Sequence, residues 1–437
     1  MVKTKDFRPN GNQNNTFLGY KEDGGFLSRG HEWEIFGGGG KDHIAGDRRK
    51  DRLDGGDGND ILEGRGGDDR MDGGSGADRM AGGSGSDTYF VDNIGDIVQE
   101  KDFARDIIRK DGRIIGNKGS RDTVISSIDN YTLTNFVERL KLIGNAVTGR
   151  GNNLANIITA NPDKDSRLIG GGGDDELIGL GKNDHLDGNS GGDKMRGGRG
   201  NDTYVVNSVR DQVIELRNQG TDTVRVTLDS SRTAYVLPDN VENMILARNK
   251  DAKANGNGLN NLITGNDFRN EINAGSGHDT IHGKGGDDRI KAGSGTDKIF
   301  GGTGKDVMFG GTGSDRLFGE EGDDALIGFG GSTADHDSMT GGAGADTFYL
   351  GNARTVFYTT GNTFGRIMDF SRAEGDKVAV SGDPGGYQLD KTASVIGSRS
   401  ALDTRILFNG DVIGVIADTT DISLTADFVT TTERFSI

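Results

Sequence analysis

Cysteine is absent from the 437 residues, proline occurs only 4 times, and the chain has no long apolar run. Without cysteine, neither a disulfide framework nor a thiolate metal site can form. The scarcity of proline excludes a collagen-like triple helix. No stretch approaches the ~18 apolar residues of a membrane span, and no apolar run follows the two lysines near the N-terminus. We therefore expect no membrane span and no Sec-type signal peptide.

Basic residues are also fewer than acidic residues. The chain has 51 Lys and Arg against 68 Asp and Glu, which gives a formal net charge of −17. This balance disfavours nucleic-acid backbones as partners and favours cations. Glycine, by contrast, is abundant at 76 residues, more than twice its usual share of about 7%.

The glycines belong to a nonapeptide, G-G-x-G-x-D-x-U-x, in which U is a large apolar residue. It recurs in register in three arrays, within residues 37–90, 151–205 and 256–349. The third array opens with two copies in which asparagine replaces the aspartate, and it contains one copy, "GFGGSTADHDSMT", with four extra residues. Such self-similarity at a fixed period indicates a repeat architecture.

The glycine, the aspartate and the apolar residue of the nonapeptide can each be explained physically. Glycine reaches backbone conformations that are closed to residues with a Cβ, so carbonyl oxygens can converge. Aspartate adds a carboxylate, and Ca²⁺ prefers ~6–8 such oxygen ligands. A flexible Gly/Asp linker needs no apolar residue at position eight, yet every copy has one, and we expect it to point inward. In the first array these residues are Ile44, Leu53, Leu62, Met71, Met80 and Tyr89.

The repeats resemble those of the RTX (repeats-in-toxin, or haemolysin-type) family of secreted calcium-binding proteins. This resemblance implies an all-β fold, a right-handed parallel β-roll in three arrays with β-strand spacers and a C-terminal β cap. It implies that the first six residues of each repeat form a turn and the last three a short strand, with two repeats completing one coil. It also implies that aspartates two repeats apart share a Ca²⁺ ion.

The resemblance assigns the metal ligands to the aspartate at position six of each repeat. In array one these are Asp42, Asp51, Asp60, Asp69, Asp78 and Asp87, and in array two Asp175, Asp184, Asp193 and Asp202. In array three they are Asp279, Asp288, Asp297, Asp306, Asp315, Asp324, Asp337 and Asp346. Pairing each with its counterpart one coil later predicts about 12 Ca²⁺ ions. Their charge would turn the formal balance from −17 to about +7.

Without calcium the stacked carboxylates repel one another, and glycine makes ordering costly. We therefore expect the calcium-free arrays to be largely disordered, with binding energy serving as folding energy.

The remaining segments read as spacers and caps. Residues 91–150 and 206–255 resemble each other, from "DTYFVDNIGDIVQE" and "DTYVVNSVRDQVIE" onwards, which indicates a duplicated unit. Their alternating patterns predict β-strands that stack on or extend the roll. We expect residues 1–36, with Trp33, to form an N-terminal cap and residues 350–437 a C-terminal β cap. Within that cap, Asn409-Gly410 between apolar runs predicts a hairpin, and the last residues resemble secretion signals of type I substrates.

The sequence contains fragments of catalytic motifs but completes none of those considered below. "HEWEI" from His31 has Ile35 where a zinc motif needs its second histidine. His278 and His282 fall on repeat positions rather than on a helix, and no G-x-S-x-G motif is present. We therefore expect no enzyme.

Position seven is often basic, as at Arg52, Arg70, Arg79, Lys194, Arg289, Lys298 and Arg316. These residues either compensate charge and protect edges or form a track for an anionic polysaccharide.

The sequence thus predicts a secreted or cell-surface calcium-binding protein with a structural or adhesive role, exported by a type I secretion apparatus. One alternative is a component of an RTX enzyme or toxin with activity in the spacers or cap. Another is a calcium-dependent binder of anionic surface polysaccharide.

Overall fold

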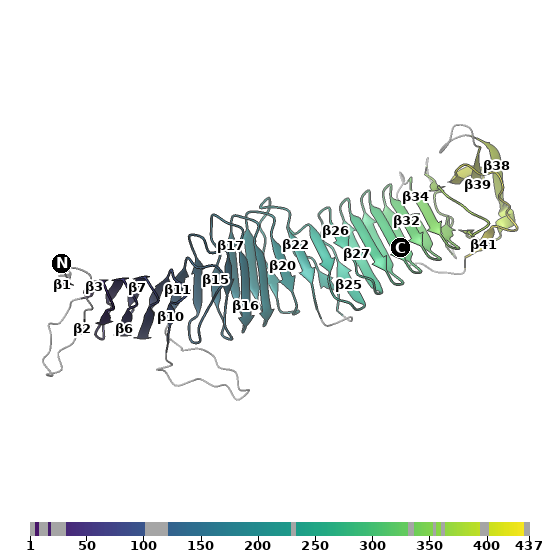
Figure 1. The fold of residues 1–437 in the computed structure, drawn as a ribbon. Helices are drawn as coiled ribbons and strands as arrows, with labels where there is room; N and C mark the ends of the chain where they lie inside the picture. The colour runs from purple at the N-terminus through teal and green to yellow at the C-terminus, as the bar shows by residue number, and fades with distance from the viewer. Residues whose placement is uncertain are drawn as a thin grey trace, which may run out of the picture. The chain divides into compact units, whose positions relative to one another are not determined.

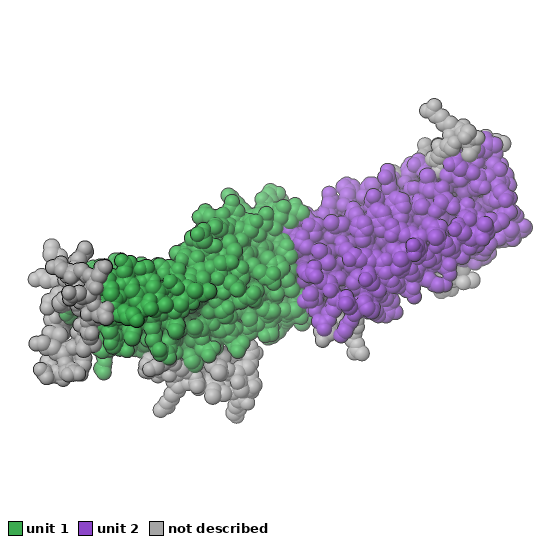
Figure 2. Space-filling view, viewed as in Figure 1, with its two compact units in different colours: residues 1–221 green, residues 222–437 purple. Residues whose placement is uncertain are grey.

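The computed structural model describes residues 5–7, 16–18, 32–100, 121–228, 233–330, 336–352, 355–359, 363–393 and 402–431. The chain divides into two compact units, Met1–Thr221 and Asp222–Ile437, coloured separately in Figure 2. Within the described ranges there is no α-helix, only one 3₁₀ turn, η1 (Pro384–Gly386). No helix of this part of the chain is long and apolar enough to cross a membrane.

Unit 1 is a parallel β-roll in which successive strands alternate between facing sheets (Figure 1). One sheet has eleven strands, in the order β1 (Lys5–Phe7), β3 (Trp33–Gly39), β5 (Arg52–Asp57), β7 (Arg70–Ser75), β9 (Thr88–Val91), β11 (Thr123–Ser126), β13 (Arg139–Leu142), β15 (Ile157–Thr159), β17 (Glu176–Leu180), β19 (Lys194–Gly198) and β21 (Gln212–Val213). A five-stranded sheet has the order β10 (Ile97–Val98), β8 (Arg79–Ser84), β6 (Ile61–Gly66), β4 (His43–Ala45) and β2 (Thr16–Leu18). A further row contains β12 (Tyr131–Thr132), β14 (Thr148–Arg150), β16 (Arg167–Gly172), β18 (His185–Ser190) and β20 (Thr203–Val206).

Unit 2 repeats this arrangement. A nine-stranded sheet has the order β23 (Tyr235–Val236), β25 (Ala252–Asn255), β27 (Asn270–Ser276), β29 (Arg289–Ser294), β31 (Val307–Thr312), β33 (Ala325–Phe329), β35 (Thr347–Tyr349), β37 (Lys377–Val380) and β41 (Phe428–Thr430). The other row runs β22 (Thr223–Val226), β24 (Asn243–Leu246), β26 (Leu262–Thr264), β28 (Thr280–Gly285), β30 (Lys298–Thr303), β32 (Arg316–Glu321), β34 (Ser338–Ala343), β36 (Gly365–Ile367), β40 (Asp411–Ile416), β39 (Asp403–Phe408) and β38 (Tyr387–Ala393).

The residue at position eight of each repeat forms the core. Ile44, Leu53, Leu62, Met71, Met80 and Tyr89 are all fully buried, as expected from the sequence. Their neighbours on either side alternate outward, since Ile61 is 41% exposed beside Leu62. This period-two pattern buries one face of each strand against the facing sheet.

The strands of the repeats are longer than the family resemblance implied. Strand β5, for example, starts at position seven of one repeat and ends at position three of the next. The glycine at position two lies inside the strand, as Gly56 does with φ +95°. A Cβ there would lie 2.1 Å from the Gly38 carbonyl oxygen one coil earlier. Glycine at this position therefore favours close stacking of coils, although Arg65, Lys284 and Glu320 occupy the equivalent position with φ of +74°, +82° and +79°.

The spacer strands continue the sheets of the roll. Strand β11 pairs in parallel with β9 and with β13, so the segment 91–150 adds coils between arrays one and two. In unit 2, β23 pairs with β25 and β25 with β27, which leads into array three. Residues 101–120 of the first spacer lie outside the described residues.

The C-terminal cap departs from parallel pairing. Strands β39 and β40 form an antiparallel hairpin around Asn409 and Gly410, whose φ angles are +52° and +90°. The hairpin predicted from the Asn-Gly pair is thus confirmed, because these residues tolerate positive φ. Strand β41, from the stretch that resembles a secretion signal, pairs in parallel with β37. Residues 432–437, and most of the predicted cap 1–36, lie outside the described residues.

Candidate calcium sites

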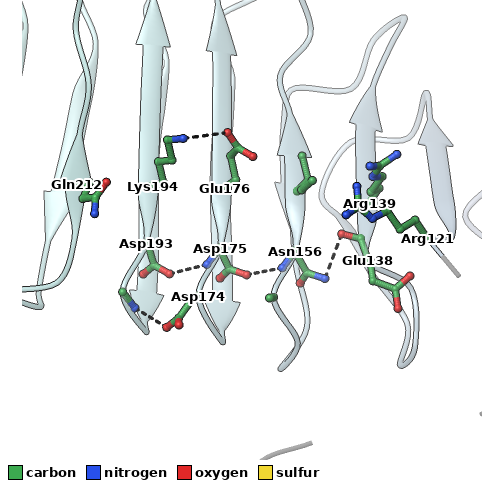
Figure 3. Close-up of a pocket in the computed structure, with 13 residues that line it drawn as sticks. Arg121, Glu138, Arg139, Asn156, Asp174, Asp175, Glu176, Asp193, Lys194 and Gln212 are labelled. Atoms are coloured by element: carbon green, nitrogen blue, oxygen red, sulfur yellow. Dashed lines mark hydrogen bonds and ion pairs between the residues drawn. The ribbon is translucent and has the colours of Figure 1, made fainter. Parts of the chain in front are cut away.

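The aspartates at position six form a ladder along each array. All eighteen are buried, with at most 3% of any residue exposed. Asp60 Oδ1 accepts the backbone N–H of Asp42 at 2.7 Å, and Asp78 Oδ1 accepts that of Asp60 at 2.7 Å. Figure 3 shows the same ladder in array two, where Asp193 receives the N–H of Asp175. Every pair of aspartates predicted to share an ion is joined in this way.

The second carboxylate oxygen, Oδ2, has a different role. In most repeats this atom is buried and makes no hydrogen bond to protein. Residues of this kind are Asp60, Asp69, Asp78, Asp87, Asp175, Asp193, Asp279, Asp288, Asp297, Asp306, Asp324 and Asp346. A buried carboxylate oxygen without a partner is costly, so this row of atoms indicates a ligand that is not protein.

In several repeats a carbonyl oxygen from the next coil faces this atom, as at Asp60, Asp69 and Asp288. A Cβ placed on Gly55 would lie 2.4 Å from Asp60 Oδ2 and 2.5 Å from the carbonyl oxygen of Gly73. Both oxygens thus border one small space, which exists because position one has no side chain. The space is lined by Asp60, the Gly73 carbonyl and Asp78, whose Oδ1 binds the Asp60 N–H.

Burial and mutual repulsion raise the pKa values of these carboxyls. The pKa of Asp69 rises to about 8, first because the group is buried and then because Asp87 and Asp51 are close. Burial likewise raises the pKa of Asp175 to about 8, with Asp193 adding to it. At neutral pH these two carboxyls are therefore largely protonated in the calcium-free fold, and they must lose their protons before a cation can bind.

This donor set fits Ca²⁺. Carboxylate and carbonyl oxygens in a flexible, glycine-lined space are the ligands that this hard cation prefers. Asp60, Asp78 and the Gly73 carbonyl would hold one ion, and the equivalent atoms would hold the others. When bound, the ion supplies positive charge between coils and connects them.

Three predicted ligands have a second oxygen that is already used. Asp51 Oδ2 accepts the N–H of Asp47 at 2.8 Å, and Asp184 Oδ2 accepts that of Leu180 at 3.2 Å. In both repeats a residue other than glycine occupies position two, and its backbone N–H donates to the carboxylate. Asp337, in the repeat with extra residues, accepts the Tyr358 hydroxyl at 2.6 Å. These three are the weakest of the predicted ligands.

In the repeats with asparagine at position six, a side-chain amide replaces the carboxylate. In Asn270 the side-chain amide Nδ2 donates to the carbonyls of Asn266 and Phe268, and to Asp288 Oδ1 at 3.0 Å. It also reaches the Gly283 carbonyl at 3.5 Å, the counterpart of Gly73. The amide thus supplies hydrogen-bond donors to the oxygens that would otherwise face a cation.

The ladder extends beyond the arrays to aspartates that sequence reasoning missed. Asp96 Oδ1 accepts the Asp78 N–H at 3.0 Å, and Asp211 Oδ1 accepts the Asp193 N–H at 3.1 Å. Both keep the eighteen-residue spacing, so a search by spacing alone would have found them. Asp122 and Asp376 accept from Asp87 and Asp346 across longer intervals, and no spacing signal marks them.

Side chains at position seven lie on the outer sheet faces, among acidic residues and aromatic rings. Arg52 lies 3.9 Å from Glu34 and Lys194 lies 3.8 Å from Glu176. The Arg70 guanidinium lies 3.6 Å from the centre of the Phe90 ring. These three basic residues thus have an acidic or aromatic neighbour on the outer face, whereas Arg52 and Arg70 are also paired with each other in register.

Comparison with known families agrees with this geometry. The family model of the RTX calcium-binding nonapeptide repeat (4 copies) matches residues 36–71, 54–89, 169–204, 255–290, 282–317, 291–326, 309–348 and 332–354. No curated protein matches the chain. The fold and the stacked carboxylates define a calcium-binding parallel β-roll. The chain accordingly contains RTX calcium-binding repeats, in multiple copies along the sequence.

Proposed function

We propose that this protein is a secreted or cell-surface structural or adhesive protein that folds when it meets extracellular calcium. The observation that carries the proposal is the row of buried Oδ2 atoms without protein partners. Because desolvated carboxylates without a counter-ion oppose folding, the compact roll requires cations. About 12 sites follow from the paired aspartates.

Calcium concentration then acts as the switch. Extracellular modules of this affinity class bind with Kd values of about 10⁻⁴–10⁻³ M. Such sites stay empty in a cytosol and fill outside the cell, so the chain would cross the envelope unfolded. This order of events suits a type I secretion apparatus, which we propose as the export route.

We propose no catalytic activity. Unit 1 has a cavity of about 460 Å³, whose lining includes Arg121, Glu138 and Arg139 of the first spacer (Figure 3). It is lined by charged and amide side chains, without a Ser, Thr, His or Tyr among its lining residues. Lys194 and Arg196 beside it both face Glu176, at 3.8 and 3.5 Å. This lining supports charge compensation at the surface of the roll rather than a nucleophile with its base.

The experiment is a calcium titration of the purified chain from chelator to millimolar Ca²⁺, followed by circular dichroism, with Mg²⁺ as the control. We expect a cooperative gain of β signal with Ca²⁺ and none with Mg²⁺. A folded spectrum in chelator that calcium leaves unchanged would contradict the proposal. An Asp60→Asn variant should require a higher calcium concentration, since it removes one ligand charge from the ladder.

A further inference from the structure

The end of array one contains a glutamate where the repeats have glycine. Strand β10 pairs with β8 so that Ile97 lies beside Arg79 and Val98 beside Met80. Gln99 N–H then donates to the Met80 carbonyl at 2.9 Å. Continuing this register puts Glu100 beside Gly82, the first residue of the last repeat. In inner coils that place belongs to a position-one glycine, as Gly73 follows Gly55.

This register brings three acidic side chains together. Asp87, Glu100 and Asp122 each offer a carboxylate oxygen, and these oxygens lie within 4.8 Å of one another. The residues are 0%, 8% and 3% exposed. Asp87 N–H donates to Asp122 Oδ1 at 2.8 Å, as between aspartates of successive coils. The cluster therefore has the geometry of a repeat site, with a glutamate carboxylate in place of the glycine carbonyl.

Two oxygens of the cluster have no hydrogen-bond partner. These are Asp87 Oδ2 and Glu100 Oε1, both buried. A Cβ on Gly82 would lie 2.2 Å from Asp87 Oδ2 and 2.3 Å from the Tyr89 hydroxyl oxygen. This hydroxyl accepts the Gly82 N–H at 2.9 Å and lies where inner repeats such as that of Asp60 have a carbonyl oxygen. Burial and the carboxylates of Asp122 and Asp87 raise the pKa of Glu100 to about 8.

We propose that Asp87, Glu100 and Asp122 bind a Ca²⁺ ion at the end of array one. This site has a higher calcium affinity than the sites inside the array. This inference rests on the proposed calcium-dependent folding. A third carboxylate raises the ligand charge, which strengthens calcium binding. The site also connects the array to the spacer, because Glu100 and Asp122 lie beyond the repeats.

The duplicated spacer keeps the same glutamate. Glu215 follows Asp202 by as many residues as Glu100 follows Asp87. It is buried, and its carboxylate accepts the hydroxyl of Tyr204, the counterpart of Tyr89. Glu100 accepts backbone hydrogen bonds from Gly82 and Gly83 but leaves its Oε1 without a partner. At the end of array three, both carboxylate oxygens of Asp369 accept backbone N–H groups, from Gly341 and Gly342 at 2.9 Å each. There the acidic residue is held by hydrogen bonds.

The test compares Glu100→Gln with Glu63→Gln in the full chain. Glu63 is in the same array but on the outer face, 3.6 Å from His43, so both variants lose one charge. Bound Ca²⁺ is counted at saturation by equilibrium dialysis and metal analysis, and folding is followed by circular dichroism. We expect Glu100→Gln to bind one ion fewer than wild type, and Glu63→Gln to bind the full number.

Equal ion counts in the two variants, with calcium-dependent folding intact, would overturn this site alone. A wild-type chain that folds without calcium at pH 8 would instead overturn the proposed function. If Glu100→Gln does not fold, terbium luminescence decides, because the Tyr89 ring lies against the site and can sensitise bound Tb³⁺. Tyr89→Phe should then lose part of the tyrosine-sensitised emission, and unchanged emission would overturn the site.

Discussion

Each repeat aspartate divides its carboxylate between two tasks. Asp78 Oδ1 accepts the Asp60 N–H at 2.7 Å and so connects successive coils, while its Oδ2 stays without a protein partner. An asparagine could perform the first task but would bring no charge to the second. The carboxylate is needed because the second task is binding a cation.

The raised pKa values predict how the calcium-free chain responds to pH. The pKa of Asp69 and that of Asp175 rise to about 8 in the fold from the ordinary value of 3.8. The folded form therefore binds more protons than the unfolded form between about pH 4 and pH 8. Stability from protonation is present below about pH 4 and is lost as pH rises through about 8. Circular dichroism in chelator should show structure at pH 4 that disappears towards pH 8.

Calcium should respond to pH in the opposite direction, because ligands must lose their protons before the ion binds. We expect calcium affinity to fall as pH decreases below about 7 and binding to release protons, which calorimetry in two buffers of different ionisation enthalpy would measure. Affinity that is independent of pH between 5 and 8 would contradict the burial of these carboxyls.

Asn270 provides the converse experiment. Its amide donates to Asp288 Oδ1 at 3.0 Å and to nearby carbonyls. In Asn270→Asp these donors are lost and their acceptors remain buried, which costs about 1–3 kcal/mol. The new carboxylate should bind one additional Ca²⁺ ion. Equilibrium dialysis checks the ion count, and denaturant unfolding at low calcium checks the stability.

At the scale of the strand, one buried side chain per repeat connects the two sheets. Leu62 in β6 is fully buried, whereas its neighbour Ile61 is 41% exposed. Alternate outward positions carry charge, as Arg52 does opposite Glu34. The alternation of buried and exposed side chains therefore specifies each strand. Strand length contributes little, since β9 has only four residues.

Leu62→Ala and Ile61→Ala form a matched pair. The first leaves a cavity between the sheets and should lower the free energy of unfolding by about 2–5 kcal/mol. The second removes an outward side chain and should change it by no more than about 0.5 kcal/mol. Both are measured by denaturant unfolding in saturating calcium. Equal effects would mean that position eight does not form the core.

The glycine turns limit what else the strands tolerate. Gly58 has φ +142°, and a Cβ there would lie 1.5 Å from the Gly40 carbonyl oxygen. The first four positions of a repeat are thus constrained by stacking against the preceding coil. The hairpin at Asn409-Gly410 was predictable for a simpler reason, since its requirement for positive φ is local to two residues.

At the scale of the whole molecule, charge decides which state is populated. The net charge is −17, and eighteen of the 68 acidic residues are aspartates that the fold brings together in buried rows. Monovalent salt screens exposed charges but cannot replace ligands in buried sites. Calcium therefore acts on folding and not merely on net repulsion.

Limited proteolysis tests this distinction. Position-seven residues such as Arg70 and Arg289 lie within strands β7 and β29, where backbone is paired on both sides. Trypsin should cut there in chelator, with or without added NaCl, and should be blocked by millimolar Ca²⁺. Protection by NaCl alone would show that screening is sufficient.

The sequence by itself determined the repeat architecture and the inward residue at position eight, because a nonapeptide period is visible without coordinates. The β-roll and the paired aspartates were implied by the resemblance to RTX repeats, and two of the pairs, which span the four extra residues, lie 22 residues apart. The tertiary structure alone decided where each second oxygen points. In it, the second carboxylate oxygens of Asp51 and Asp184 accept backbone N–H groups. Asp122, distant in sequence, accepts the Asp87 N–H. Such contacts depend on which coil stacks on which, because strand pairing across an irregular spacer follows no period.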